Sequence, residues 1–383
     1  MNTTPADDNQ TMLADSARKY TERGYTAAAR AASAASTHGC ASLRWREFAD
    51  MGWLALPLPE ADGGLGGTLD DMCVLAEEMG RALVVEPWNA CGVMAASLLA
   101  ATADAQQRSH WLPALAAGDK RVAFAAWEPG SRFDATQIAT RAEPVAGGYR
   151  LNGAKELALG APGADALLVS AMLAAPDGTP RPALFLVEPG TAGLELQAYA
   201  MIDGRHAAHI RLAGVTVAVH ARLDAAADIT QAIGAAIDRA TVVQCAEATG
   251  AMARALEITL DYLKTRKQFG RILATNQALQ HRLVDLHVAV EETRALVHAA
   301  ARAFTGPELQ RQAHVAAAKA FTSQAARLAW EEAVQMHGAI GMTDEYALSH
   351  YVKYLATTQI LFGDEQLHLE RLATVEDQLH RAA

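Results

Sequence analysis

Apolar positions in the last third of the chain recur at alternating steps of three and four residues. One such run covers residues 242–263, and a second covers residues 279–304. This spacing gives each segment a continuous apolar face and is typical of helices that pack in a bundle. A Thr-Gly-Pro break at 305–307 precedes a third helical pattern over residues 308–336, and a fourth begins near Glu345. The pattern predicts an up-down bundle of four long antiparallel helices.

The middle of the chain, from Arg121 to Val219, shows a different pattern. Short runs with β-type composition are separated by Gly, Pro and Asp residues, which favour turns. Their close spacing predicts a compact β-barrel or β-sandwich between two helical regions. The predicted strands cover residues 122–126, 137–142, 148–153, 166–170, 183–187 and 209–217.

The first part of the chain has a helical pattern, interrupted by a glycine run at 63–67 that we expect to form a turn. The predicted helices cover residues 14–37, 42–54, 69–82, 91–100 and 105–115. The fold class is therefore predicted to be mainly α with a central β domain. The predicted domains are residues 1–117 (N-terminal helical domain), 118–224 (middle β domain) and 225–383 (C-terminal four-helix bundle).

Composition narrows the class of protein. With 383 residues, 51% of them apolar and 20% charged, the chain can bury a large core in more than one subdomain. A formal net charge of −10 without a long basic stripe argues against nucleic acid as a partner. Residues 1–12 are polar and lack a signal-peptide pattern, and no apolar segment approaches the length of a membrane span. We expect a cytoplasmic protein.

The cysteines carry no metal or disulfide signature. Cys40, Cys73, Cys91 and Cys245 lie far apart, without a Cys-x-x-Cys motif or a Cys/His cluster. This spacing argues against a zinc site and against a disulfide framework. We expect reduced thiols and no metal.

One short stretch concentrates positive charge on this acidic chain. Lys264, Arg266, Lys267 and Arg271 surround Phe269-Gly270. Long helical patterns lie on both sides, so we predict that Phe269-Gly270 forms the sharp bend between two helices. The cations either bind a small anionic ligand or form a solvated helix end whose charges complement the helix dipole. The residue types alone leave both interpretations open.

Five stretches, in order along the chain, carry the motifs of one family. They are Leu56-Pro-Leu-Pro-Glu-Ala-Asp-Gly-Gly-Leu-Gly, Glu128-Pro-Gly-Ser with Asp134, Leu151-Asn-Gly-Ala-Lys, Tyr262 to Gln277, and Gln335-Met-His-Gly-Ala-Ile-Gly-Met-Thr-Asp-Glu-Tyr. On these residues the chain resembles the acyl-CoA dehydrogenase family, from about residue 40 to residue 373. A lone Arg-Lys-Gln-Phe-Gly is a weak signal, whereas ordered matches across three domains are specific.

The resemblance implies a cofactor, a reaction and partners. In that family FAD lies extended between the β domain and the bundle, and its adenosine-pyrophosphate end reaches a second subunit. The residues of this chain that correspond to FAD contacts are Arg266 at the pyrophosphate, Gln268, Phe269 and Gln277 at the adenosine end, and Gln335 and Gly338 at the end of the third bundle helix. The implied reaction is α,β-dehydrogenation of an acyl-CoA thioester. The family commonly passes electrons to an electron-transfer flavoprotein and forms dimers or dimers of dimers.

The chain departs from the family at the catalytic base. Most members carry a Glu directly before a Gly after the fourth bundle helix, and here Phe362 precedes that Gly. A smaller group places the Glu on the first bundle helix, where this chain has Ala240. Asp364 and Glu365 are the remaining candidate acids, although acids at these positions are also favoured as caps of the following helix.

The flavin contacts of the β domain also differ. Family members usually have a Thr before Glu-Pro-Gly and a Trp-x-Ser/Thr after Asn-Gly-x-Lys. This chain has Trp127 before Glu128, and Leu157 and Leu159 at the positions of the Trp and the hydroxyl residue. Trp127 could replace part of the lost stacking area.

Three hypotheses follow from these departures. The first is that the chain is the base-lacking subunit of a heteromeric dehydrogenase, because the run Gly363 to Leu369 resembles such subunits. The second is a complete homo-oligomeric dehydrogenase that uses Asp364 or Glu365. The third is a flavin-free binding or scaffold protein that keeps the fold.

Overall fold

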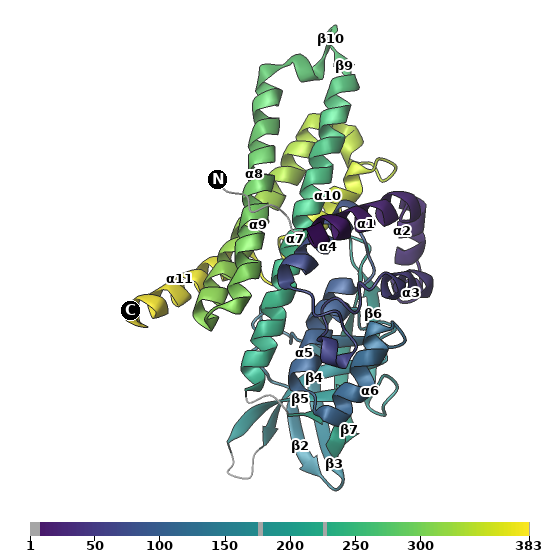
Figure 1. Ribbon diagram of the computed structural model, residues 1–383, viewed down its shortest axis with the longest axis vertical. Coiled ribbons are helices and arrows are strands. Elements are labelled where there is room, and N and C mark those ends of the chain that lie inside the picture. The colour runs from purple at the N-terminus through teal and green to yellow at the C-terminus, as the bar shows by residue number, and fades with distance from the viewer. Residues whose placement is uncertain (1–7, 175–178, 225–227, 383) are drawn as a thin grey trace. The chain divides into compact units, whose positions relative to one another are not determined.

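The computed structural model describes residues 8–174, 179–224 and 228–382 (Figure 1). The expectation about the polar segment 1–12 lies largely outside these residues. The domain boundary predicted at 224/225 adjoins the undescribed residues 225–227. No helix in the described part of the chain is long and apolar enough to cross a membrane.

Contacts divide the chain into two compact units that are discontinuous in sequence. The first consists of residues 1–30, 69–84 and 241–383, and the second consists of residues 31–68 and 85–240. The N-terminal helices are therefore shared between the units. In the first unit lie α1 (Asp8–Gly24) and α4 (Leu69–Arg81), and in the second lie α3 (Ser42–Asp50), α5 (Ala96–Thr102) and α6 (Ala105–Ala116), while α2 (Ala27–Ala34) spans the division at residue 30/31.

These helices occur where the hydrophobic pattern predicted them, with two differences. The helix predicted over residues 14–37 is broken between α1 and α2 at Tyr25-Thr26. The helix predicted from residue 91 begins earlier, with a π-helical segment η2 (Trp88–Ala95) that continues into α5. The glycine run at 63–67 forms the expected turn, which follows a short 3₁₀ segment η1 (Glu60–Asp62).

The second unit contains an eight-stranded sheet. Its strands are β1 (Val122–Ala125), β2 (Arg141–Val145), β3 (Gly148–Leu159), β4 (Ala166–Ala174), β5 (Pro180–Val187), β6 (Leu194–Ala200), β7 (His206–Ala218) and β8 (Arg222–Leu223). The order is β6-β7-β3-β2-β4-β5-β8, and β1 also pairs with β4. Both β1 and β2 run parallel to β4, one at each end of it, while the other pairs are antiparallel.

The sequence missed two strands and misplaced part of a third. The alternating residues of β6, Leu-Glu-Leu-Gln-Ala-Tyr-Ala, carry a strand signal that the prediction did not use. The short β8 was also missed. The strand predicted over residues 137–142 begins only at Arg141, because the carboxylate of Glu128 accepts the amides of Ala139 and Thr140 that a ladder would need.

The first unit is a helical bundle. Its helices are α7 (Ile229–Thr265), α8 (Gln277–Arg302), α9 (Glu308–His337), α10 (Leu348–Thr358) and α11 (Glu365–Ala382), of which α7 begins in the second unit. One apolar cluster joins side chains of α7, α8, α9 and α10. The predicted bundle is therefore confirmed, although α10 has only 11 residues.

The predicted seams of α7 and α8 lie in this core. Their Thr residues are fully buried without loss of a hydrogen bond, because each hydroxyl donates to the carbonyl four residues earlier. The distances are 2.9 Å for Thr249, 2.7 Å for Thr259 and 2.7 Å for Thr293. The period of the seam therefore predicted burial correctly even where the residue is polar.

Two glycines bring α4 and α7 into backbone contact. A Cβ on Gly80 would lie 1.8 Å from the carbonyl oxygen of Glu247, and a Cβ on Gly250 would lie 1.8 Å from the carbonyl oxygen of Glu77. Any larger residue at either position would force the helices apart. Beside this crossing, Arg294 of α8 donates to Glu77 at 2.7 Å, so the same region of α4 is held on two sides.

Candidate functional site

The predicted bend between α7 and α8 is a two-residue β-hairpin. Lys267–Gln268 (β9) pairs antiparallel with Arg271–Ile272 (β10), leaving Phe269-Gly270 as the turn. The φ angles are 51° at Phe269 and 79° at Gly270, as a type I′ turn requires at both positions. A phenylalanine in this left-handed conformation costs about 1–2 kcal/mol. The chain therefore accepts local strain to place Phe269 in the turn between β9 and β10 (Figure 1 labels both strands).

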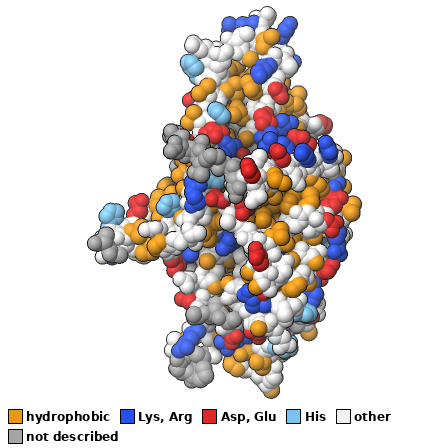
Figure 2. All heavy atoms as spheres, in the orientation of Figure 1, with side chains coloured by type: hydrophobic (Ala, Val, Ile, Leu, Met, Phe, Trp, Pro, Cys, Tyr) orange, Lys and Arg blue, Asp and Glu red, His pale blue; other side chains and the backbone are white. Residues whose placement is uncertain are grey.

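The side chains of the hairpin are presented to solvent. Phe269 is 98% exposed. Lys264, Arg266, Lys267 and Arg271 are exposed, and their side chains form no ion pair or hydrogen bond with any described residue. Figure 2 shows Lys and Arg side chains at this end of the helical unit. Lys264 lies in the last turn of α7, so the exposed cations fit a solvated helix end as well as a site for an external anion.

The remaining predicted contacts lie at two nearby helix ends. Gln277 begins α8 and is exposed, and Gln335 is exposed in the last turn of α9. Gly338 ends α9 with φ 67°, and the space beside its Cα is open. The imidazole of His337 stacks on the ring of Tyr262 with centroids 4.4 Å apart, so the end of α9 lies against the base of the hairpin. The structure thus gathers Gln335 and Gly338 near the end of α7, which Arg266 follows directly.

The base position on the α10–α11 loop is occupied by a buried aromatic ring. Phe362 is 4% exposed and adopts φ 60°, and Gly363 follows with φ 100°. His368 fixes this turn, because its Nε2 lies 2.8 Å from the carbonyl oxygen of Phe362 and must donate to it. Burial lowers the pKa of His368 to about 4, so the imidazole is neutral near pH 7.

A buried lysine fixes the other end of the same loop. Lys319 of α9 is completely buried, and its Nζ donates to the carbonyl of Thr358 at 2.9 Å and to Ser323 Oγ at 2.8 Å. Thr358 is the last residue of α10, where the helix dipole favours a cation. Burial lowers the pKa of Lys319 to about 8.

The two candidate acids have structural partners. Asp364 Oδ1 accepts the amide of Leu367 at 2.9 Å, which caps the start of α11. Glu365 Oε1 accepts a hydrogen bond from Gln324 at 2.7 Å. The second family base position, Ala240, is fully buried on α7, and its carbonyl accepts a hydrogen bond from Asn89 at 3.0 Å.

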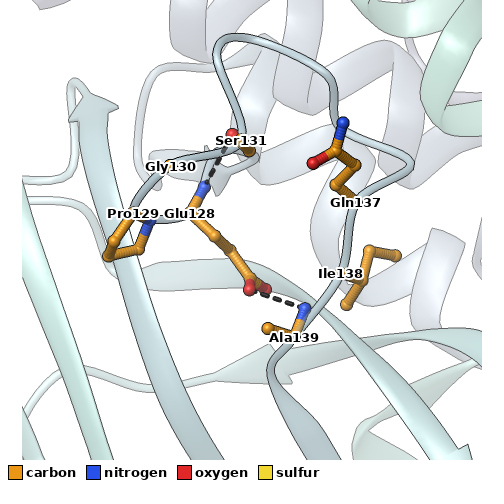
Figure 3. A pocket seen from close by; sticks show the side chains of 7 residues that line it. All are labelled: Glu128, Pro129, Gly130, Ser131, Gln137, Ile138 and Ala139. Carbon is orange, nitrogen blue, oxygen red and sulfur yellow. Dashed lines mark hydrogen bonds between the residues drawn. The ribbon is translucent and has the colours of Figure 1, made fainter.

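A buried ion pair joins two of the family motifs. Lys155 Nζ lies 2.6 Å from Glu128 Oε1, and both residues are buried. Lys155 also donates to Ser170 Oγ at 2.8 Å, and Glu128 accepts the amide of Ala139 at 2.7 Å (Figure 3). The loop that Glu128 holds lines an open pocket of about 280 Å³. The sequence prediction missed this pair, although both motifs place an uncompensated charge near predicted strands.

The ion pair sets the ionisation of both groups. Burial acts to raise the pKa of Glu128, but the Lys155 ammonium and the amide donors outweigh it, so the pKa lies below its ordinary value. Burial lowers the pKa of Lys155 in spite of the carboxylate beside it.

The residues at the flavin-ring positions are apolar; Trp127 and Leu159 are buried, and Leu157 is half-buried. Trp127 is 3% exposed and packs edge-on against Phe133, with ring centroids 5.2 Å apart. Leu159 is 5% exposed, and Leu157 adopts φ 50° at an irregularity of β3. None of these side chains carries a hydroxyl group.

The described residues therefore fit one half of FAD better than the other. The exposed cations around Arg266 suit a diphosphate, and the exposed ring of Phe269 suits an adenine. At the positions of the family's flavin-ring contacts, Trp127 and Leu159 offer covered apolar surface. Among the described residues no group of His, Cys, Asp and Glu could hold a metal, and all four cysteines are buried and free.

Comparison with known proteins agrees with this architecture. Models of the acyl-CoA dehydrogenase N-terminal, middle and C-terminal domains match residues 7–119, 123–215 and 229–375. Fold and site together define an FAD-dependent oxidoreductase, whose cofactor is FAD. The chain belongs to the acyl-CoA dehydrogenase family.

Individual relatives cover most of the chain. An acyl-CoA dehydrogenase of Bacillus subtilis (strain 168) is 29% identical over 84% of this chain and 86% of its own length. A solved structure of a Tcur3481-Tcur3483 steroid ACAD variant is 31% identical, covers 98% of this chain and 99% of that chain, and has a TM-score of 0.86. A glutaryl-coenzyme A dehydrogenase complex shares the fold at 21% identity, with coverages of 98% and 96% and a TM-score of 0.88.

The buried ion pair predicts a strong asymmetry between single and double substitutions. Lys155→Met leaves the Glu128 carboxylate buried without its counterion and should destabilise the protein by about 3–5 kcal/mol. Adding Glu128→Gln removes the unpaired charge and keeps an acceptor for the amides of Ala139 and Thr140, so it should recover much of that loss. Chemical unfolding of the three proteins measures the effect. A double variant no more stable than Lys155→Met would show that the two residues are not coupled.

The buried imidazole predicts a pH-dependent stability. The pKa of His368 is about 4 in the folded protein against 6.5 unfolded, so its contribution is present above pH 6.5 and is lost as the pH falls toward 4. Between pH 7 and pH 5 the native protein should lose about 2 kcal/mol more than the His368→Gln variant. Unfolding curves at both pH values test this. If both proteins lose the same amount of stability between pH 7 and pH 5, protonation of His368 is not the cause of the loss.

Proposed function

We propose that this chain is the base-lacking subunit of a heteromeric FAD-dependent acyl-CoA dehydrogenase. Its hairpin holds the adenosine-diphosphate end of an FAD whose chemistry is completed in a base-bearing partner. One observation carries the proposal. The cations from Lys264 to Arg271 are exposed and unpaired within the described chain, while Phe362 and Ala240 occupy both family base positions.

The residues proposed to bind FAD, here called the clasp, are Arg266, Gln268, Phe269, Gln277, Gln335 and Gly338. Arg266 supplies charge-assisted hydrogen bonds to the pyrophosphate. Phe269 offers an aromatic face to the adenine, and Gly338 allows the backbone at the end of α9 to approach the cofactor. The amides of Gln268, Gln277 and Gln335 provide hydrogen bonds at the adenosine end. When bound, the flavin accepts the hydride that leaves the β carbon of the acyl chain.

Removal of the α proton belongs to the partner in this proposal. The step needs a carboxylate in a dry pocket, where burial raises its pKa. Phe362 has no proton acceptor. Asp364 and Glu365 are engaged with Leu367 and Gln324, which favours a capping role.

The proposal draws its partner and substrate class from the relative at 31% identity. That structure is named for two proteins, Tcur3481 and Tcur3483, and is described as a steroid ACAD. By analogy, the partner of this chain is a related subunit with a Glu before the Gly, and the substrate is an acyl-CoA with a bulky ring system. The electron acceptor is an electron-transfer flavoprotein.

A second candidate function is a flavin-free binding or scaffold protein. The residues Trp127, Leu157 and Leu159 favour it, because they provide none of the family's hydroxyl contacts to the flavin ring. Stoichiometric FAD in the purified complex would exclude this candidate.

Arg266→Ala should weaken FAD binding. Loss of a charge-assisted contact costs about 1.5–3 kcal/mol, which corresponds to roughly a tenfold to hundredfold higher dissociation constant. The chain is co-expressed with a related chain that carries a Glu before the Gly, and FAD affinity is measured on the purified complex. Arg46→Ala is the matched control, because it removes an exposed guanidinium that is paired with Asp119. It should leave the FAD affinity of the complex unchanged.

Two results would contradict the proposal. One is an unchanged FAD affinity in the Arg266→Ala complex. The other is a chain that, purified alone, binds FAD stoichiometrically and reduces it with an acyl-CoA, because no partner would then be needed.

Asp364→Asn combined with Glu365→Gln should leave the turnover of the complex within about twofold, because asparagine also caps helices and neither acid abstracts the proton. Steady-state kinetics with the acyl-CoA substrate provide the measurement. In the partner, replacing the Glu before the Gly with Gln should abolish turnover. Loss of flavin reduction in the double variant would instead assign the base to this chain.

A further inference from the structure

The hairpin tip is anchored only at its base in the described chain. From Arg266 to Arg271 every side chain is exposed and none has a partner among the side chains of the described residues, so neighbouring side chains do not fix the direction of the tip. The backbone provides two links. The amide of Leu273 donates to the carbonyl of Arg266 at 2.9 Å, and the amide of Arg266 donates to the carbonyl of Tyr262 at 2.8 Å. The orientation of Arg266 therefore follows that of Tyr262, one helical turn earlier.

Tyr262 belongs to a cluster of three rings. It stacks on His337 with centroids 4.4 Å apart and an interplanar angle of 24°, and its hydroxyl lies 3.4 Å from the carbonyl oxygen of His337. Tyr346 completes the cluster, 5.3 Å from His337 and 6.4 Å from Tyr262 between centroids. The rings come from α7, from the end of α9 and from the segment before α10. One imidazole thus contacts both segments that carry cofactor-binding candidates.

The imidazole of His337 is held in one orientation. Its Nδ1 lies 2.8 Å from the carbonyl oxygen of Ala333, so Nδ1 carries the hydrogen. The ring is 5% exposed, and Nε2 is buried without a partner among the described residues. Burial lowers the pKa of His337, although the carbonyl of Ala333 acts to raise it. A neutral ring stacks on Tyr262 without adding charge beneath the cations of the tip.

We propose that His337 is a positioning residue that sets the hairpin of Arg266 and Phe269 against the α9 end carrying Gln335 and Gly338. The proposal rests on the proposed function for the identity of the ligand, but its structural part does not. His337 touches Tyr262 on one side and is followed directly by Gly338 on the other. A substitution at His337 changes the distance between the hairpin and the end of α9, but it replaces none of the residues proposed to bind FAD.

His337→Leu should loosen the hairpin of the full-length chain. Hydrogen exchange of a peptide covering residues 262–276 should become about tenfold faster, as expected for the loss of a stacked aromatic pair and one hydrogen bond. Exchange in β1 should not change. Tyr262→Leu removes the same stacking contact and should also make the exchange of residues 262–276 faster. This variant tests the proposal if His337→Leu does not fold.

The matched control is His209→Leu. His209 stacks on Tyr199 with centroids 4.7 Å apart at 29°, and both lie in the β unit. This variant should leave the exchange of residues 262–276 unchanged. His337→Phe keeps the stack and loses the bond to Ala333, so it should fall between the native protein and His337→Leu. Hairpin exchange within twofold of native in both His337→Leu and Tyr262→Leu would overturn the proposal.

Affinity for FAD in the co-purified complex separates this proposal from the proposed function. His337→Leu should raise the dissociation constant about tenfold, and His337→Phe should restore most of the affinity. If Arg266→Ala weakens FAD binding and His337→Leu does not, positioning by His337 is wrong and the clasp remains. If neither variant weakens binding while hairpin exchange still rises, the assignment of FAD to the clasp is wrong.

Discussion

The contact between α4 and α7 is the constraint on which the helical unit depends. Gly80 and Gly250 each face a carbonyl of the opposite helix at a distance that leaves no room for a Cβ. Such a crossing fixes the separation and the rotation of two helices more tightly than side-chain packing does. Because α7 continues without a break to Thr265, the same crossing fixes where its end presents the hairpin.

The hairpin between α7 and α8 is both exposed and locally strained. A type I′ turn favours Asn-Gly, and a phenylalanine in its first position is strained and almost completely exposed. Neither property contributes to folding of this chain alone. Together with cations that have no partner in the described chain, they indicate a surface completed by another molecule. The acidic composition of the rest of the chain makes this local positive charge more specific for an anion.

The sequence predicted what depends on period and missed what depends on tertiary partners. The seam positions of α7, including Thr249 and Thr259, could be predicted because a hydroxyl satisfies itself within its own helix. The strand over 137–140 was wrong because Glu128, eleven residues away from Ala139, takes its amide. The sequence pattern assigned no role to His337. Its stack on Tyr262 joins residues 75 positions apart, and no local pattern encodes that contact.

The turn at Phe362-Gly363 explains how a base can be absent while its setting persists. The turn is held by His368 through the carbonyl of residue 362, by the cap that Asp364 forms, and by Lys319 at the end of α10. None of these contacts uses the side chain of residue 362. These three contacts can therefore form whether that side chain is a carboxylate or a phenyl ring. Membership of the family therefore fixes the fold at this position. Catalytic competence depends separately on which side chain residue 362 carries.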